Sequence, residues 1–498
     1  MLKQTTSKLL TKKYFDTFSL TESNIKSFNY LIEHELTKIL QENAELEPQV
    51  LPPEIESFKI KLEKIWIEKP VIIEADGSRR QIFPMEARLR QLNYSAPVYI
   101  QLSTYVNGVQ RETLTTQIGN IPIMLKSKFC YLNGLSSEEL IGKGEDPDDP
   151  GGYFIINGTE KALVMIEDLA PNNFLVDKQS VGVSPYVGKI FSESGTYKIQ
   201  HVIEQLKDIL FYISFTRVKR IPVFIVLKAL GMTSDEEIIK AIDVDDLYID
   251  EIYMNLYKFA EIKTQEEALD YIAKRIGITQ PSEIRIERIR NMLEKFFLPH
   301  IGMEAKDLKL KAYNLCKYIK YFILHSKGAI QKNDKDHLKN KRLKLAGELL
   351  ADLIRVNLKI LLNDAIYNFQ RVVKRGKFPS LKVIIREKLL TSRIYSAMAT
   401  GNWLGNRTGV SQRMERVNYL QTISHLQRVV SPLSSSQENF EARELHPTHY
   451  GRLCAIETPE GPSIGLRKNL ALFASVSEEA EENKVMDKIK ELGVKIIK

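Results

Sequence analysis

Residues 341–375 read KRLKLAGELLADLIRVNLKILLNDAIYNFQRVVKR and contain the clearest helical pattern of the sequence. Apolar side chains recur there at spacings of three and four residues, and no proline interrupts the segment. The stripe consists of Leu345, Leu349, Ile354, Leu358, Leu361, Ala365, Phe369 and Val372. It predicts one long helix over 341–375 that crosses a hydrophobic core.

The first part of the chain combines a helical pattern with a strand pattern. Ser19 and Glu22 have the spacing of a capping box at a helix start. Between residues 58 and 116, short β-favouring runs are separated by the turn pairs Asp76-Gly77 and Asn107-Gly108. We therefore expect a surface helix followed by a sheet. The helical positions are Ile25, Phe28, Leu31, Ile32, Leu36 and Ile39.

Three further segments have distinct patterns. The turn-dense run 142–152 leads into strand-like 153–156 and the pair Asn157-Gly158, which predicts a tight hairpin or a sharp strand-to-helix turn. Residues 169–301 mix β-like runs with acidic helical segments and predict a separate α/β unit. Residues 477–498 have the pattern of a short amphipathic segment.

Size and composition indicate a folded multidomain protein. A chain of 498 residues with 43% hydrophobic and 27% charged residues predicts roughly three globular domains. Its three cysteines lie far apart, which argues against a disulfide scaffold or a thiolate zinc site and fits a reducing compartment. The polar N-terminus and the short apolar run 221–230 predict a cytoplasmic chain that is neither secreted nor membrane-spanning.

The positive charge is concentrated in one fifth of the chain. The formal net charge is +8, but residues 371–468 hold 16 Lys and Arg against 7 Glu and no Asp. Arginine forks suit phosphate oxygens, whereas a solvated basic face explains the same count equally well. The arginines of this stretch include Arg393, Arg407, Arg413, Arg416, Arg428, Arg443, Arg452 and Arg467.

The sequence lacks the motifs of a self-contained active site. No Walker loop, HExxH zinc pair or Gly-x-Ser-x-Gly elbow is present, and Pro447 separates His446 from His449. Cys454 beside Arg452 is a weak nucleophile candidate, and a small buried residue is the favoured alternative. The acidic pairs Asp146/Asp148, Asp243/Asp245 and Asp334/Asp336 fit solvated loops or helix faces better than a two-metal site.

Several runs resemble a known family. Five runs are similar to the fork of the second-largest, β-type subunit of multisubunit DNA-directed RNA polymerases. They are 399–403 (ATGNW), 409–413 (GVSQR), 422–426 (TISHL), 440–452 (FEARELHPTHYGR) and 457–462 (ETPEGP). Further landmarks follow the family's order at 151–158, 297–300, 334–343 and 345–350. The resemblance therefore spans nearly the whole chain.

The resemblance implies a mixed α/β multidomain fold. A protrusion would comprise 1–168 and 302–376, a lobe 169–301 would be inserted in it, and a fork would follow at 377–476. Residues 477–498 would start the next, external region or form a chain-end segment. The chain resembles the separately encoded N-terminal half, the B″ type, of archaeal polymerases, although a truncated chain would look the same.

The resemblance also implies positioning residues. Gln412, Arg413 and Arg428 would lie along the RNA–DNA hybrid, and the loop 431–440 near the downstream edge of the bubble. Asp336, His337, Lys341 and Arg342 would lie close by on the protrusion. Arg452 and Glu457 would face the side where substrate arrives and the trigger element of the largest subunit. Alternatively, His337 and His425 are packed core histidines and Glu457 caps a turn.

The implied function is that of a DNA-directed RNA polymerase subunit, a component of a nucleotidyltransferase that helps form the active-centre cleft. It would position the hybrid and downstream DNA. The catalytic Mg²⁺ belongs to an Asp triad of the largest subunit, so this chain is expected to hold no catalytic residue, metal or cofactor. Expected partners are the remaining half of the subunit, the largest and other subunits, template and non-template DNA, nascent RNA and nucleoside triphosphates, but no membrane.

A free-standing nucleic-acid-binding scaffold and an independent metabolic enzyme are the competing classes of protein.

Overall fold

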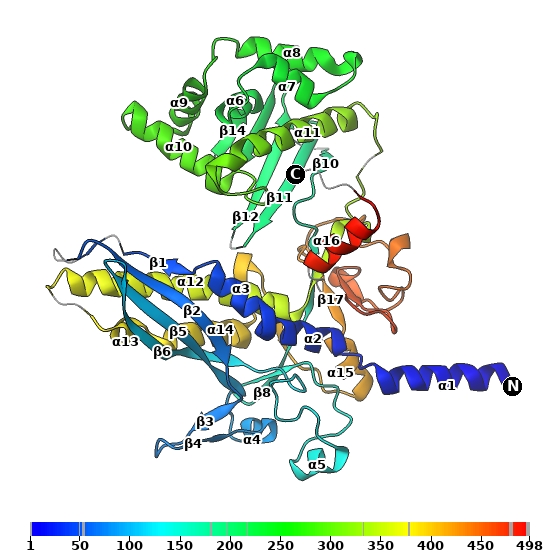
Figure 1. Cartoon of the computed structure of the whole chain (residues 1–498). Coiled ribbons are helices and arrows are strands. Elements are labelled where there is room, and N and C mark those ends of the chain that lie inside the picture. Colours follow the sequence, from blue (N-terminus) through cyan, green and yellow to red (C-terminus); the bar gives the residue numbers. More distant parts are fainter. Residues whose placement is uncertain are drawn as a thin grey trace. The chain divides into compact units, whose positions relative to one another are not determined.

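The computed structural model describes residues 2–48, 50–51, 55–179, 182–195, 197–216, 218–331, 333–376, 379–477 and 482–494. The chain forms two compact units (Figure 1). Unit 1 comprises Met1–Asp168 and Leu343–Lys498, and unit 2 comprises Leu169–Arg342. Unit 2 thus begins where the sequence placed the lobe, and it includes residues 302–342, which we assigned to the protrusion. The named domains of the family remain a prediction.

A four-stranded antiparallel sheet forms one side of the core of unit 1. Its strand order is β1 (Glu45–Leu46), β2 (Phe58–Ile67), β5 (Ser95–Val106) and β6 (Val109–Pro122). Alternate residues of β2 are buried, as expected for a sheet with one face on a core. The β5–β6 turn is Asn107-Gly108, and both residues have the positive φ that a tight hairpin requires. The predicted sheet is confirmed.

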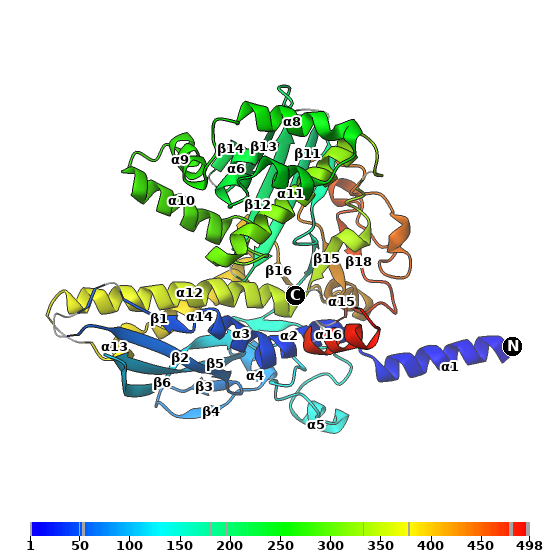
Figure 2. The same cartoon turned by 45° about the horizontal axis from the view of Figure 1, so that its top comes forward.

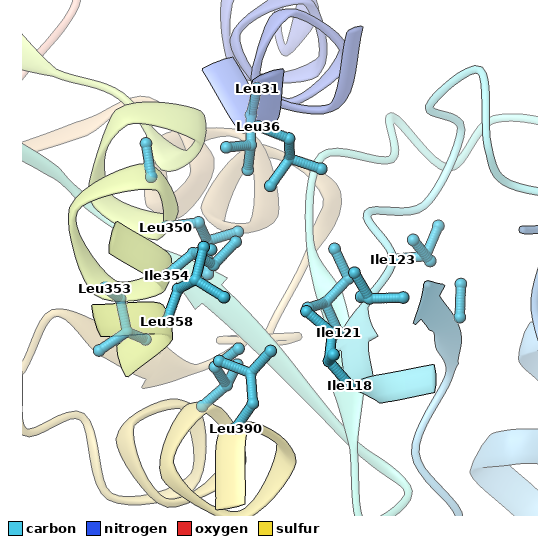
Figure 3. Packing of buried hydrophobic residues seen from close by; sticks show 14 of the residues in the cluster. Leu31, Leu36, Ile118, Ile121, Ile123, Leu350, Leu353, Ile354, Leu358 and Leu390 are labelled. Carbon is cyan, nitrogen blue, oxygen red and sulfur yellow. The ribbon is translucent and has the colours of Figure 1, made fainter. Parts of the chain in front are cut away.

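The long helix α12 (Ala346–Val373) packs its apolar stripe into the same core. Figure 3 shows Ile354 and Leu358 of α12 among Leu31, Ile118 and Leu390, which come from other helices and from β6. The helix was predicted to begin at residue 341, which is wrong. Lys341–Lys344 form strand β15, and Leu345 has the extended backbone of a helix N-cap. The apolar stripe starts only at Leu345, so a helix over the preceding residues would bury no apolar face in the core.

The predicted N-terminal helix exists as three consecutive pieces after α1 (Leu2–Thr17). They are α2 (Glu22–Tyr30), the π-helical turn η1 (Leu31–Glu35) and α3 (Leu36–Gln41). The predicted Ser19–Glu22 capping box is wrong, because Thr21 is the N-cap and its side chain makes no capping bond. Thr21 Oγ1 instead donates to the carbonyl of Pro150 at 2.7 Å, which ties the turn-dense loop to this helix.

Two small sheets of unit 1 join segments that are far apart in sequence. One has the order β16 (Ser411–Arg413), β8 (Thr159–Leu163), β7 (Phe154–Ile156), with the predicted hairpin at Asn157-Gly158. In the other, β17 (Arg428–Val430) pairs in parallel with β9 (Met165–Leu169) and antiparallel with β18 (Arg467–Asn469). The predicted hairpin is confirmed, and residues 154–169 become the scaffold for 411–430.

The remaining helices of unit 1 are short. They are α4 (Pro84–Leu89), α5 (Ser137–Gly142), α13 (Leu381–Ile384), α14 (Glu387–Thr400), α15 (Tyr419–Leu426) and α16 (Glu482–Glu491). A two-stranded ribbon, β3 (Val71–Ile73) with β4 (Arg79–Gln81), completes the unit. Helix α16 lies in the predicted amphipathic segment, of which residues 478–481 and 495–498 lie outside the described residues.

Unit 2 has its own hydrophobic core between a sheet and helices. The antiparallel sheet runs β10 (Leu175–Lys178), β11 (Tyr186–Ser194), β12 (Tyr197–Gln205), β13 (Phe211–Phe215), β14 (Val218–Pro222). Figure 2 shows α6 and α11 across these strands. A separate α/β unit is confirmed, but it extends to Arg342 and not only to residue 301 as predicted. Its helices are α6 (Val223–Ala229), α7 (Asp235–Ile242), α8 (Ile249–Lys258), α9 (Gln265–Ile276), α10 (Ser282–Phe296) and α11 (Leu308–Ser326).

The cysteines form no disulfide. Cys130 and Cys316 are buried and Cys454 is half-buried, and all three are free thiols. Burial raises the pKa of the Cys130 thiol, and it raises that of Cys316 to about 12. Among the described residues, no helix combines the length and the apolar character that a bilayer crossing requires.

Candidate nucleic-acid interface

Arg428 is held by a carboxylate of its own unit. Strand β17 begins with Arg428, whose two terminal nitrogens lie 3.2 and 3.3 Å from the carboxylate oxygens of Glu415. The Arg428 side chain is 13% exposed, so the arginine end of this pair is shielded from water. Gln421 donates a further hydrogen bond to the same carboxylate. The hydrogen bond from Arg428 is the main cause that lowers the pKa of Glu415 to about 2.

His425 joins this pair to Gln412. The Glu415 backbone N–H donates to Nδ1 of His425 at 3.2 Å, so a neutral ring carries its proton on Nε2. That nitrogen lies 3.0 Å from Oε1 of Gln412 and donates to it. His425 is fully buried, and desolvation lowers its pKa to about 4. It is therefore a packed, neutral histidine that fixes Gln412, as one of the two alternatives had it.

Arg413 differs from its neighbours in being open to solvent. It ends strand β16, opposite Lys161 of β8, and its side chain is exposed. No hydrogen bond or ion pair is recorded for its guanidinium within the described part of the chain. Gln412, one residue earlier, is half-buried and donates to the carbonyl of Gly409 at 2.9 Å. Successive side chains of this short strand point to opposite faces, so Gln412 joins the polar network and Arg413 lies in solvent.

Glu457 and Arg452 lie on the loops after β17. Ser424 of α15 donates its hydroxyl to Glu457, and Asn469 of β18 donates to the Ser424 carbonyl at 2.8 Å. Glu457 is therefore connected to the helix that carries His425. Arg452 is exposed and donates to the carbonyl of Thr448 at 3.3 Å, and among the described residues it has no recorded bond with the network.

The other four predicted residues lie in unit 2, in a loop that is ordered by Asp334. Its carboxylate accepts the backbone N–H groups of Asp336 and His337 at 2.9 and 3.1 Å. Lys341 is 8% exposed and pairs with Asp336 at 2.9 Å. Arg342 is exposed and donates to the carbonyls of Lys339 and Lys341.

His337 serves the same loop. Its Nδ1 accepts the Lys339 N–H at 3.0 Å and caps the 3₁₀ turn Leu338–Asn340. The ring is half-buried, unlike that of His425. Within unit 2, Asn340 holds the turn in place, because it donates to the Asp334 carbonyl and accepts from Asn173 at 3.1 Å. Most polar groups of this loop thus maintain its shape, and the Arg342 side chain faces solvent.

The eight arginines that the sequence singles out fall into three groups. The side chains of three form ion pairs with carboxylates, and those of two donate to backbone carbonyls. The other three are exposed, and their guanidinium groups have no recorded hydrogen bond or ion pair among the described residues. In that order they are Arg407, Arg416 and Arg428; Arg443 and Arg452; and Arg393, Arg413 and Arg467. The exposed group keeps its guanidinium donors available for phosphates.

The carboxylates that neutralise this stretch come largely from elsewhere in the sequence. Arg407 pairs with Asp168 at 2.7 Å, and Arg416 reaches both Asp149 and Glu160. Lys468 pairs with Glu167 at 3.1 Å, and both side chains are buried. The positive surplus counted along the sequence is therefore smaller at the surface of the folded unit.

A groove lies within unit 1 beside this network. Its volume is about 560 Å³, and its walls are mostly residues 405–410 and 430–435. Arg467, one of the exposed arginines, lines it together with Ser463. Residues 431–435, the first half of the loop 431–440 that was expected near the edge of the bubble, thus line part of an open polar groove.

Sequence reasoning missed Glu415 and Asp168, the counter-ions of two arginines that it named. Glu415 was visible as an acid within the basic stretch, between two predicted site residues. Asp168 gave no signal, because 239 residues separate it from Arg407. No group of three or more potential metal ligands of the His, Cys, Asp and Glu types occurs in the described ranges.

Comparison with known proteins defines the class. Residues 19–392 match the family described as RNA polymerase beta subunit, and residues 412–476 match RNA polymerase Rpb2, domain 3. The first match alone covers well over half of the chain. The chain therefore belongs to the RNA polymerase beta subunit family.

Individual relatives fall into two kinds that differ in length. The chain is 42% identical to the DNA-directed RNA polymerase subunit Rpo2 of Saccharolobus solfataricus, over 97% of this chain and 42% of that protein. It is 41% identical to subunit Rpo2N of Methanocaldococcus jannaschii, over 98% of this chain and 99% of that protein. Rpo2N of Halobacterium salinarum is 37% identical over 97% and 95%, respectively. The chain thus spans 42% of the Rpo2 relative but nearly all of the Rpo2N relatives.

Proposed function

We propose that this chain is the N-terminal portion of the second-largest subunit of a DNA-directed RNA polymerase, and that its fork positions the RNA–DNA hybrid and the downstream DNA. The observation that carries this proposal is the set of exposed, unengaged guanidinium groups beside a rigid polar network in the family-matched segment. Arg413 and Arg467 represent that set in unit 1. Phosphate contacts of this kind are independent of base sequence, as template-directed synthesis on any template requires.

The polar network gives the interface its rigidity. Gln412, His425, Glu415 and Arg428 are linked by hydrogen bonds at 3.0 to 3.3 Å. We infer that Arg428 ties the start of β17 to the segment that follows β16, with its charge partly offset by Glu415. Arg413 follows Gln412 directly, so its guanidinium group would project from a backbone that the network holds in place.

The remaining predicted residues have supporting roles in this proposal. Glu457, tied to α15 through Ser424, and Arg452 on the following loop would face the substrate side. In unit 2, Arg342 would offer an exposed guanidinium, while Asp336, His337 and Lys341 keep its loop in shape.

The chemistry of nucleotide addition would come from the rest of the enzyme. We propose that the largest subunit supplies the Mg²⁺ ligands and that the remaining half of this subunit completes the cleft. The partners would be these chains, the other subunits, both DNA strands, nascent RNA and nucleoside triphosphates. This chain's own residues would bind phosphates, orient the hybrid and leave the reacting atoms to the neighbouring chain.

Reconstitution of the whole enzyme tests this function. The purified chain is mixed with the remaining polymerase subunits, and template-dependent nucleotide incorporation is measured with and without it. Activity that requires the chain supports the proposal, and full activity in its absence contradicts it. The competing scaffold class predicts that the chain binds nucleic acid alone and fails to join the other subunits.

The salt dependence of the reconstituted complexes tests the phosphate contacts. Replacing Arg413 or Arg467 by Ala is expected to lower the slope of log affinity against log salt by about 1, because one phosphate contact is lost. Arg111→Ala is the matched control, since Arg111 is an exposed arginine on β6 whose guanidinium has no recorded partner in the part of the chain that the structure describes. Equal slopes for all three variants and the unaltered chain would contradict the assignment.

A further inference from the structure

Helix α8 of unit 2 has one face buried in the core and a second face with large apolar and aromatic side chains exposed to solvent. Ile252, Asn255 and Leu256 are buried in the core, whereas Tyr253, Met254 and Tyr257 are 50, 53 and 85% exposed. The exposed three lie on one stripe, because their spacing is that of a single helix face. Leu247, in the preceding turn, is 79% exposed. Figures 1 and 2 place α8 at the end of unit 2 drawn at the top.

The exposed stripe is held on a rigid support. Asn255 accepts the Phe211 N–H at 3.0 Å and donates to the Ile209 and Glu251 carbonyls at 3.1 and 2.7 Å. These bonds fix α8 to the start of β13 through a buried side chain. The tyrosines on the opposite face therefore have a defined direction, and binding there costs little ordering of the backbone.

Acidic side chains surround this stripe. Residues 243–261 contain six Asp and Glu and one Lys, in a chain whose net charge is +8. Asp243 and Glu251 pair with Lys320 and Lys327 of α11 and its end. Three further acids, Asp245, Asp250 and Glu261, are exposed and have no recorded ion pair among the described residues. Asp250 precedes Tyr253 and Met254 by three and four residues, so it lies on the same face.

We propose that this α8 face, defined by Leu247, Asp250, Tyr253, Met254 and Tyr257, docks a basic segment of a protein partner. Large apolar side chains of that segment would cover the two tyrosines and Met254, and its Lys or Arg residues would pair with Asp245, Asp250 and Glu261. Exposed tyrosines suit this role, because they offer large contact areas at a small cost in side-chain entropy. The proposal concerns unit 2 and does not depend on the proposed function of unit 1.

The sign of the charge selects this occupant over others. Nucleic acid and anionic membrane surfaces carry the same negative charge as the face, so both are repelled. A second copy of the chain, docked face to face, would oppose acids to acids. A basic segment gains both apolar burial and charge complementarity.

Site-specific cross-linking tests the proposal on the full chain. Tyr257 is replaced by p-benzoylphenylalanine in the tagged chain in its native cells, and the cross-linked peptide is sequenced after irradiation. The expected adduct is a segment of another protein with a net positive charge and at least two large apolar residues. No adduct, or an adduct with nucleic acid, a second copy or an acidic or neutral segment, overturns the proposal.

A synthetic peptide of the cross-linked segment then serves as the probe in fluorescence anisotropy with the purified full chain. Tyr253→Ser and Asp250→Lys are each expected to weaken binding by about tenfold, and higher salt weakens it further. Tyr367→Ser, at a 62% exposed tyrosine of α12, is the matched control and leaves the affinity unchanged. Equal affinities for all variants contradict the assignment of the face.

Discussion

Glu415 and Arg428 form a two-pronged ion pair in which each carboxylate oxygen faces one terminal nitrogen, at 3.2 and 3.3 Å. The arginine is nearly buried, while the carboxylate side chain is 41% exposed. The pair therefore lies at the rim of the network, with its negative end toward solvent. A phosphate that approaches Arg428 has to share the guanidinium with Glu415.

Glu415→Gln is accordingly expected to strengthen the hold of the assembled enzyme on nucleic acid. The amide keeps a hydrogen bond to Arg428 but no longer neutralises its charge, so Arg428 should attract a phosphate more strongly and affinity at fixed salt should rise about two- to fivefold. Filter binding of elongation complexes over a salt series measures this. Arg428→Ala should lower the affinity, and in the double variant the gain from Glu415→Gln should disappear. A gain that persists without Arg428 would contradict the coupling.

The buried His425 makes the stability of unit 1 depend on pH. Its pKa is about 4 in the folded chain against an ordinary 6.5, so unfolding takes up a proton between these values. Stability is fully present above pH 6.5 and falls as the pH drops toward 4, by at most about 1.4 kcal/mol per pH unit. Urea unfolding followed by tryptophan fluorescence reports this unit, because Trp66 and Trp403 both belong to it.

His425→Gln tests that dependence directly. The variant is expected to unfold more easily at pH 7 but to lose part of the pH dependence between 6.5 and 4. His34→Gln is the control, since His34 is exposed and should leave the pH dependence intact. A His425→Gln profile parallel to that of the unaltered chain would mean that another group titrates.

Arg416 joins the turn-dense loop to the strand β8. Its guanidinium donates to Asp149 and Glu160 at 2.8 and 2.7 Å and lies over the ring of the buried Tyr153. Arg416→Ala leaves two carboxylates without this partner and should destabilise unit 1 by about 1–3 kcal/mol. Arg413→Ala, at a neighbouring exposed arginine, should change stability by less than about 0.5 kcal/mol. Equal urea midpoints for the two variants would argue that the Arg416 contacts contribute nothing.

Gly347 allows α12 to approach α2 closely. A Cβ added at this residue would lie 2.1 Å from the backbone oxygen of Ser27, and the Gly347 N–H donates to the Ser27 hydroxyl at 3.1 Å. Gly347→Ala is expected to cost about 1–3 kcal/mol, even though Ala favours helices, because the clash is with backbone. Gly142→Ala, where an added Cβ meets nothing, is the control. A midpoint for Gly347→Ala at or above that of the control would refute this packing.

The sequence predicted the parts of the fold that have a strong periodic signal. The stripe of α12 and the turn at Asn107-Gly108 are examples, since each depends on local spacing or on a residue that tolerates positive φ. The strands Ser411–Arg413 and Arg428–Val430 could not be found in this way, because three residues are too few to show a period. Their place depends on pairing with strands more than 200 residues away.

The candidate site was predictable in its residue types but not in its electrostatics. The arginines of the fork were visible in the sequence, yet it did not reveal which of them are neutralised. Arg407 and Arg413 look equivalent in the sequence. In the folded unit, Arg407 forms an ion pair with Asp168, whereas the Arg413 side chain is exposed to solvent. Only the pairing of distant segments in the folded unit separates them.

The most direct measurement of the central claim is a cross-link from RNA to the fork of the reconstituted enzyme. A photoreactive nucleotide is placed at the RNA 3′ end of a stalled elongation complex, and the cross-linked peptides of this chain are mapped. We predict adducts within residues 405–435 of unit 1, a range that holds Arg413 and the groove residues 405–410 and 430–435. Adducts confined to other parts of this chain, or to other subunits alone, would contradict the claim that this fork contacts the hybrid.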